Sequence, residues 1–250
     1  MDQNNDLVSA PTPPATQFIF HHWKFILFIL ACVGIVYARA VTYDFVTYDD
    51  YELVYQNGSY LADVSNLFHS FGTHVFTTHR TKSAYYRPVV LVSYILDYQI
   101  WELNPLGYHL TNILLHCLAT IFLFGLLKLL TENSTTSLIG SLLFALHPIQ
   151  VESVAWIAGR NDILLGLFII VMLVNYVRSL GTDDKQRRIP YGAAVAFGFA
   201  LFTKESAAFY FLLLPVLDLA VGKRSFRSLF SKSEIRRLLP FGLVLAVYLL

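Results

Sequence analysis

The sequence predicts an all-α membrane protein with several spans. Of its 250 residues, 56% are apolar and 14% are charged, and the mean hydropathy is +0.54. A soluble domain would carry about 25% charged residues. Long apolar runs recur along the whole chain. The net charge of +1 gives no indication of a nucleic-acid partner.

The apolar runs predict about seven spans. A polar, proline-containing tail, 1–23, precedes them and has neither a cationic segment nor a small-residue cleavage site, so the first run is expected to be a retained anchor. The chain stops inside an apolar run, and we therefore expect a truncated seventh span in a fragment of a longer protein. The expected spans lie near 24–41, 109–130, 137–157 and 163–177, twice within 190–222, and from 240 onward.

The apolar block 190–222 is interrupted by Lys204 and Glu205. As one helix it would be about 50 Å long, against a hydrocarbon core of about 30 Å. We therefore predict a hairpin of two short spans with the charged pair at its tip.

The distribution of basic residues predicts a cytoplasmic N-terminus, because cytoplasmic loops carry an excess of lysine and arginine. With that orientation, twelve basic residues lie inside and six outside. The outer six are Arg39, Arg80, Lys82, Arg87, Arg160 and Lys204.

The largest segment between spans is an outer loop, about 42–108, which is rich in aromatic residues. Its stretch 88–101, "PVVLVSYILDYQIW", is too short to cross a membrane comfortably. It predicts a helix lying in the interface, with Tyr94, Tyr98 and Trp101 at the level of the headgroups.

Two adjacent carboxylates, Asp49 and Asp50, follow the first span in "FVTYDDYELVY". One interpretation is a hydrated acidic patch beside the membrane. Another is a general base, because neighbouring carboxylates raise each other's pKa and a partly desolvated one can accept a proton. Metal binding is a weaker third interpretation, since no spaced ligand accompanies them.

Two further polar groups lie at or near the ends of apolar runs. His109, Asn112 and His116 share one helical face, where they either join helices by hydrogen bonds or serve a site. The stretch "HPIQVESVAWIAGRND" places His147, Glu152, Arg160 and Asp162 around a turn. The alternatives there are a functional cluster or a structural ion pair of Arg160 with Asp162 or Glu152, and Lys204 and Glu205 could likewise pair merely with each other.

Neither Cys32 nor Cys117 has a neighbour with metal-ligand spacing, and both lie in apolar runs. They are expected to be small core residues, and no metal site is predicted.

Several motifs in order resemble the GT-C glycosyltransferase superfamily, in its branch of transmembrane and tetratricopeptide-repeat O-mannosyltransferases. They are "YDD", "YRPVVLVSYILDYQIWELNPLGYHLTNILLH", "FALHPIQVESVAWIAGRNDIL" and "TKES". The resemblance covers about 24–222 and implies a GT-C-type helical bundle over 24–250. The 34-residue repeats of such proteins are not seen in this sequence.

The resemblance implies a transferase that moves a sugar, mannose being favoured, from a polyprenyl-phosphate donor to a serine or threonine hydroxyl of a protein on the outer or lumenal face. Asp49 and Asp50 match the family's catalytic acidic positions, with the choice of base left open. The outer cations would bind the donor phosphate, Arg160 and Lys204 being favoured over Arg87. His147, Glu152, Asp162, Glu205 and His109 are the remaining candidates for substrate binding.

The implied partners are the lipid-linked sugar, a protein or glycan acceptor and membrane lipid. No cofactor is required by this interpretation, and a role for a divalent metal is left open. A bacterial inner membrane is favoured, with the endoplasmic reticulum as the alternative. For an endoplasmic-reticulum protein, the sequon at Asn57 would be available for glycosylation and the one at Asn133 would not.

Other classes remain open on the sequence alone. One is an enzyme of the same superfamily that glycosylates a lipid or a surface glycan, and another is a non-catalytic membrane scaffold. A transporter would show broken helices at corresponding places in two halves, and no such repeat is found.

Overall fold

The computed structural model describes residues 15–76, 85–180, 188–222 and 224–249, and all of its regular elements are helical. Three of the described helical segments are long and apolar enough to cross a membrane: Gln17–Thr42, Pro105–Thr131 and Ile157–Ser179. The predicted all-α membrane fold is confirmed. The other apolar helices named with them, Ser134–Leu146, Tyr191–Leu201 and Ala207–Ala220, are shorter than a full span.

The α-helices are α1 (Ala15–Tyr37), α2 (Gly58–Ala62), α3 (Asn66–His69), α4 (Pro88–Trp101), α5 (Pro105–Thr131), α6 (Ser134–Leu146), α7 (Gln150–Ala155), α8 (Arg160–Ser179), α9 (Tyr191–Leu201), α10 (Ala207–Tyr210), α11 (Leu213–Ala220) and α12 (Lys232–Leu249). Short 3₁₀ segments are η1 (Ala38–Thr42), η3 (Ser70–Gly72), η4 (Ile157–Gly159) and η6 (Phe226–Phe230), and η2 (Tyr51–Tyr55) is a π-turn.

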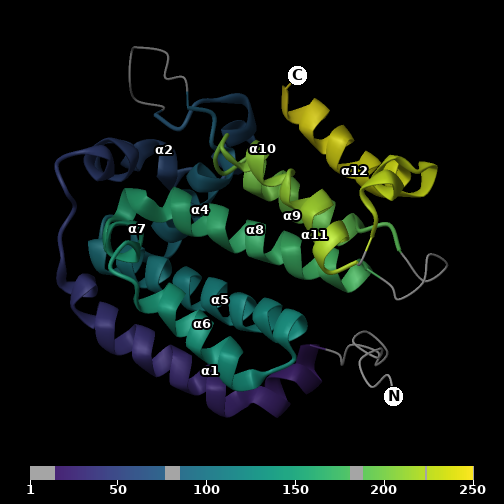
Figure 1. Ribbon diagram of the computed structural model, residues 1–250. Helices are drawn as coiled ribbons and strands as arrows, with labels where there is room; N and C mark the ends of the chain where they lie inside the picture. The colour runs from purple at the N-terminus through teal and green to yellow at the C-terminus, as the bar shows by residue number, and fades with distance from the viewer. Residues whose placement is uncertain (1–14, 77–84, 181–187, 223, 250) are drawn as a thin grey trace.

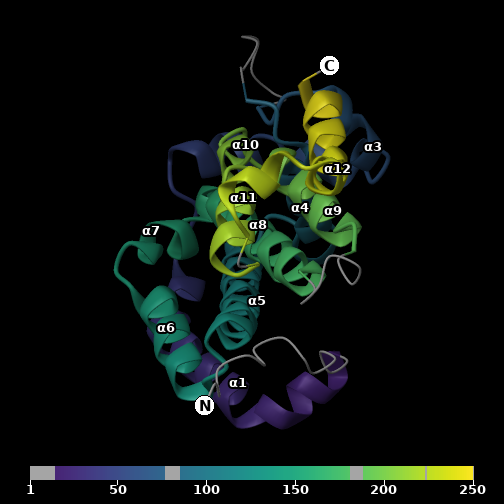
Figure 2. The same ribbon diagram turned by 45° about the vertical axis from the view of Figure 1, so that its right-hand side comes forward.

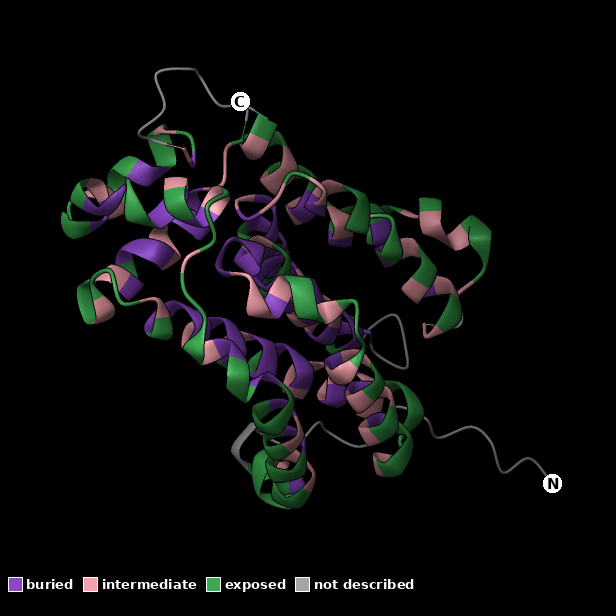
Figure 3. Cartoon of the chain, turned by 90° about the vertical axis from the view of Figure 1, so that its left-hand side faces the viewer, coloured by how far each residue is buried: buried purple, intermediate pink, exposed green. Residues whose placement is uncertain are grey.

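Helix α5 is the centre of the bundle. It packs against α1 and α6 on one side and against α8 on the other, and α8 in turn packs against α9 (Figures 1 and 2). Buried positions gather along these inner helices in Figure 3. Helix α1 leaves large apolar side chains exposed, among them Phe20 at 79% and Ile35 at 78%. Because this face is apolar and uncovered, it suits contact with lipid.

Both ends of α5 and the start of α6 are specified by local sequence. Asn104 caps α5 by accepting a hydrogen bond from the Leu106 amide, and Pro105 occupies the first turn. At the other end, Glu132 adopts a left-handed conformation (φ 56°). Asn133 then accepts bonds from the amides of Thr135 and Thr136, which starts α6 at once.

Two expected spans differ from the structure. The single span near 137–157 is wrong, because α6 ends at Leu146, the chain turns at His147 and Pro148, and α7 begins only at Gln150. Pro148 lacks an amide hydrogen and disfavours helix in the residue before it. Helix α1 also begins at Ala15, inside the segment 1–23 expected to be a tail. The tail's first fourteen residues lie outside the described part of the chain.

The predicted turn within 190–222 is confirmed, although the helices on either side of it are shorter than a full span. Helix α9 ends at Leu201, residues 202–206 form a turn that contains Lys204 and Glu205, and α10 and α11 lead back. The turn brings this charged pair to the end of the bundle where α8 begins, since Lys204 contacts Asp162. We call this the Asp49 end, and the opposite end, where α8 and α11 finish and α12 begins, the Arg237 end.

Helix α4 occupies the predicted residues 88–101. Tyr94 was placed at the level of the headgroups, which is wrong: its side chain is fully buried and its hydroxyl donates to the Ile157 carbonyl at 3.0 Å. Tyr98 and Trp101 are half-buried. Helix α4 is therefore packed into the helical bundle through Tyr94 and is not simply a helix on the surface of the protein.

The sequon at Asn57 is not available in the folded chain. Asn57 is fully buried, and its amide donates to the Leu53 carbonyl at 3.4 Å. Asn133 is exposed but caps α6. A glycan on Asn57 would have no room in this structure, so the expected availability of that site is wrong.

Candidate active site at the Asp49 end

The polar groups predicted from distant parts of the sequence meet at the Asp49 end. Arg87, just before α4, forms an ion pair with Glu205, with Nη2 and Oε1 3.1 Å apart. Lys204 Nζ lies 2.5 Å from Oδ1 of Asp162 in the first turn of α8. Lys204 and Glu205 therefore pair with other elements and not merely with each other. These four side chains, from three distant parts of the sequence, lie together at one end of the bundle.

Asp50 is an internal anchor. Its side chain is fully buried, Oδ1 accepts from the Ala158 amide at 2.8 Å, and Oδ2 accepts from the Val46 amide at 3.1 Å. Burial raises the pKa of Asp50, while the two backbone hydrogen bonds act in the opposite direction. Both carboxylate oxygens are thus occupied in holding the loop after α1 against η4.

Asp49 is the accessible member of the pair. It is half-buried, and its pKa is raised by burial and by the negative charge of Glu52, whereas Arg87 acts to lower it. A carboxyl whose pKa is raised while it still faces solvent can take up a proton near neutral pH more readily than an ordinary aspartate. The structure therefore separates two adjacent residues that the sequence could not distinguish.

Beneath this surface lies a buried ion pair that the sequence analysis missed. Arg160 Nη2 and Asp97 Oδ2 are 2.6 Å apart, with side-chain exposures of 0% and 7%. The other Asp97 oxygen accepts from the Thr111 hydroxyl at 2.7 Å. The sequence feature that could have indicated this pair is Asp97, the single acidic residue inside the apolar run of α4. Its partner, Arg160, lies 63 residues further along the chain.

The remaining donors of Arg160 are also occupied. Nε donates to Asn112 Oδ1 at 2.7 Å, and Nη2 donates to the Tyr108 carbonyl at 3.0 Å. The guanidinium lies over the ring of Tyr94, 4.6 Å from its centroid. Because Arg160 is fully buried and fully paired, its placement as a phosphate-binding cation is corrected: the side chain joins α4, α5 and α8. The expected structural partners, Glu152 and Asp162, are wrong as well.

This polar core fixes the segment 156–159 that holds Asp50. The Asn112 amide donates to the Trp156 carbonyl at 3.0 Å, and the Tyr94 hydroxyl donates to the Ile157 carbonyl. Gly159 is required by close packing, because a Cβ there would lie 2.7 Å from the Ser153 carbonyl oxygen. The Ala158 amide is thereby presented to Asp50 in a fixed position.

The other predicted site residues are placed differently. His109 is buried in α5 with its ring edge against Tyr43, and His116 Nε2 lies 3.0 Å from the Ala145 carbonyl. With Asn112 bonded to η4, this face of α5 joins helices, which was one of the two interpretations. His147 and Glu152 are exposed at the α6–α7 turn and on α7. Their assignment to substrate binding stays a prediction.

No group of three or more histidine, cysteine, aspartate or glutamate side chains suited to a metal ion occurs within the described ranges.

The Asp49 end of this all-α membrane domain thus holds a partly exposed carboxylate and two ion pairs, Arg87–Glu205 and Lys204–Asp162. The sequence profile of the family described as "Dolichyl-phosphate-mannose-protein mannosyltransferase" matches residues 69–249. The chain belongs to this family.

Its relatives include Protein O-mannosyl-transferase TMTC2 of Homo sapiens, 29% identical over 210 residues, which cover 82% of this chain and 24% of that protein. Protein O-mannosyl-transferase TMTC3 of Homo sapiens is 37% identical over 99 residues, 40% of this chain and 11% of that protein. Protein O-mannosyl-transferase TMTC4 of Homo sapiens is 30% identical over 177 residues, 63% and 24% respectively. The chain thus spans about a quarter or less of these relatives. No solved structure matches it.

The buried pair predicts a specific pattern of stability. Arg160→Met or Asp97→Leu alone should lower the free energy of unfolding by about 3–5 kcal/mol, because each leaves an uncompensated buried charge. The double variant should lose less than either single variant. Lys204→Met, which breaks a partly exposed pair, is the matched control and should cost about 1 kcal/mol or less. Denaturant unfolding in detergent measures all four; a double variant that loses the sum of the two singles would contradict the assignment.

Proposed function

We propose that the chain carries the catalytic end of a membrane mannosyltransferase. The enzyme would move mannose from a polyprenyl-phosphate carrier to a serine or threonine hydroxyl of a protein. The observation that carries this proposal is that Asp49 is a partly exposed carboxylate with a raised pKa, at the same end of the bundle as Arg87 and Lys204. Membership of the mannosyltransferase family supports the chemistry.

Asp49 is the proposed general base. As the acceptor oxygen forms its bond to the anomeric carbon, its proton passes to the Asp49 carboxylate. The bond between that carbon and the phosphate oxygen breaks, and its electron pair leaves with the lipid phosphate. Asp50 is less suited to this role, because its side chain is fully buried and each of its oxygens already accepts a backbone hydrogen bond.

Arg87 and Lys204 are the proposed partners of the donor phosphate. Each is now paired with a carboxylate that is itself well exposed, 53% for Glu205 and 45% for Asp162. Ion pairs at such positions contribute about 0–1 kcal/mol, so a phosphate with more acceptor oxygens can replace the carboxylate. The same cations would then stabilise the charge that develops on the leaving phosphate.

The proposed membrane is that of the endoplasmic reticulum, with the Asp49 end lumenal. The relatives include human, mouse and frog proteins, which favours this membrane over a bacterial one. A donor that arrives within the membrane suits a site on that side, since soluble nucleotide sugars are cytosolic. The excess of basic residues in the segments at the Arg237 end supports this orientation.

Removing the Asp49 carboxylate should slow sugar transfer strongly and leave binding of the lipid-linked donor unchanged. Asp49→Asn keeps the shape of the side chain and loses the proton acceptor, so the single-turnover rate of the full-length protein should fall by about 10²–10⁴-fold. Asp44→Asn is the matched control, because Asp44 is exposed in the same loop and its side chain accepts a hydrogen bond from the adjacent Phe45 amide.

Lys204→Gln provides the contrast within the same experiment, since it should weaken binding of the lipid-linked donor as well as transfer. If Asp49→Asn transfers mannose at the parent rate, Asp49 is not the base. If Lys204→Gln binds donor normally, the phosphate lies elsewhere.

The pH profile should report the environment of Asp49. The ionised form is the active one, so the rate should rise with pH through a pKa above the usual aspartate range. Glu52→Gln removes one cause of the raised pKa and should shift this rising limb to lower pH. Glu132→Gln, at the exposed α5–α6 turn, should leave it unchanged. A limb that Glu52→Gln does not move, or moves upward, would exclude Asp49 as the titrating group.

A further inference from the structure

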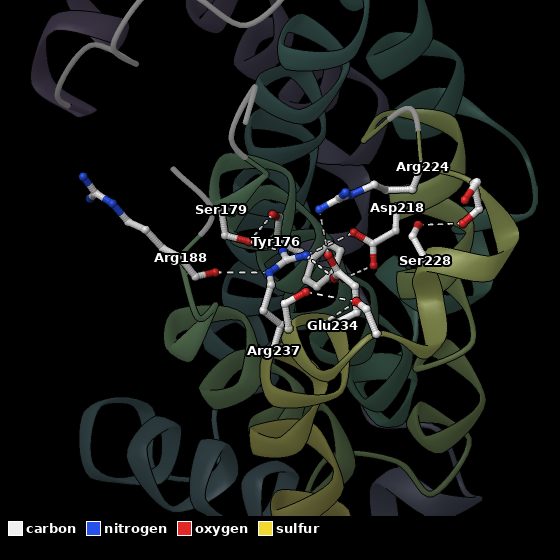
Figure 4. Close-up of polar contacts among 11 residues, drawn as sticks. Tyr176, Ser179, Arg188, Asp218, Arg224, Ser228, Glu234 and Arg237 are labelled. Atoms are coloured by element: carbon white, nitrogen blue, oxygen red, sulfur yellow. Dashed lines mark hydrogen bonds and ion pairs between the residues drawn. The ribbon is translucent and has the colours of Figure 1, made fainter. Parts of the chain in front are cut away.

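The Arg237 end holds a second buried charge network (Figure 4). Arg237 Nη1 lies 2.7 Å from Glu234 Oε2 and 3.2 Å from Asp218 Oδ1, and Tyr176 donates its hydroxyl proton to Asp218 Oδ2 at 2.6 Å. The exposed fractions of the Asp218 and Glu234 side chains are 0% and 1%. This network ties the end of α8 to α11 and to the first turns of α12.

The network removes acidic groups from the surface of this end. Asp218 and Glu234 are the acidic residues of α11 and α12. Both pair with Arg237 inside the protein, and Glu234 also pairs with Arg224 at 3.3 Å. Arg188 contributes only its carbonyl to the network, as acceptor from Arg237 Nε, and its guanidinium points away in Figure 4.

The surface beside the network is cationic and aromatic. In η6 and the start of α12, the exposed cations are Arg227, Lys232 and Arg236. Phe226 and Phe230 are 67% and 70% exposed, with their rings 5.7 Å apart, edge to face. Two exposed phenylalanines beside three exposed cations suit contact with a membrane surface, which is apolar on one side and anionic on the other.

We propose that η6 and the first turns of α12 form a binding surface for the headgroups of anionic phospholipids. The cations would contact the phosphate and carboxylate groups, and the two phenylalanines would enter the adjoining acyl region. The surface continues into the exposed apolar face of α12, at Ile235 (57%) and Leu239 (55%), so it faces the same medium as that helix. Continuity of the cations with these exposed apolar side chains favours a lipid over an acidic protein as the occupant, because a membrane surface joins anionic headgroups to an apolar layer.

The test compares two spin-labelled lipids, phosphatidylserine and phosphatidylcholine, with the full-length protein reconstituted in phosphatidylcholine membranes. Electron paramagnetic resonance gives the association constant of each lipid with the protein. The parent should prefer phosphatidylserine, and added salt should weaken that preference. Each cation near a charged headgroup is worth up to about fivefold in binding, so Arg227→Gln/Lys232→Gln/Arg236→Gln should bring the ratio close to unity.

Arg39→Gln is the matched control, because Arg39 is an exposed cation at the other end of the bundle; it should keep the parent ratio. Unfolding midpoints identify any variant that does not fold. In that case Arg227→Gln alone, which lies outside the Arg237 network, should give a smaller loss in the same direction. A triple variant that folds and keeps the parent ratio overturns the proposal, whether or not the same surface captures an acidic protein.

Discussion

The ion pair between Asp97 and Arg160 holds three helices of this protein together. Two charges removed from water within an apolar bundle are stable only when their remaining hydrogen-bonding capacity is met. Here Thr111, Asn112 and the Tyr108 carbonyl meet it. The pair therefore locks α4, α5 and α8 in one arrangement, and Asn112 carries the constraint to the segment before α8. The Ala158 amide of that segment in turn fixes Asp50.

The two ends of the bundle use charge in different ways. At the Arg237 end, the side chains of Asp218 and Glu234 are buried and Arg237, which pairs with both, is 5% exposed, so the pairing has a structural role. At the Asp49 end, two further pairs, Arg87–Glu205 and Lys204–Asp162, have carboxylates that reach solvent. Under the proposed function, Arg87 and Lys204 would exchange these carboxylates for the phosphate of the donor, and the packed helices would hold the two cations in place.

Local signals predicted much of this fold. The helix at 88–101 and the turn at Lys204 and Glu205 followed from the lengths of the apolar runs and from the charges that interrupt them. Arg160 and Asp97 show the limit, because their pairing depends on how three helices pack, and sequence spacing carries no information about it. Asp49 and Asp50 show the same limit for two adjacent residues. Asp50 is the one that turns inward because it accepts a hydrogen bond from the Ala158 amide, more than a hundred residues away. The end of the helix before His147 could have been predicted from Pro148, because proline disfavours helix in the residue before it.

The central claim is that Asp49 supplies the base while Asp50 supplies only an anchor. Chemical rescue tests it most directly, using Asp49→Gly and Asp50→Gly in the full-length protein with single-turnover transfer measured in the presence of added formate. Formate can enter the space left by an accessible carboxylate and accept the hydroxyl proton in its place. The account predicts that formate restores transfer to Asp49→Gly and leaves Asp50→Gly inactive. Rescue of Asp50→Gly without rescue of Asp49→Gly would contradict it.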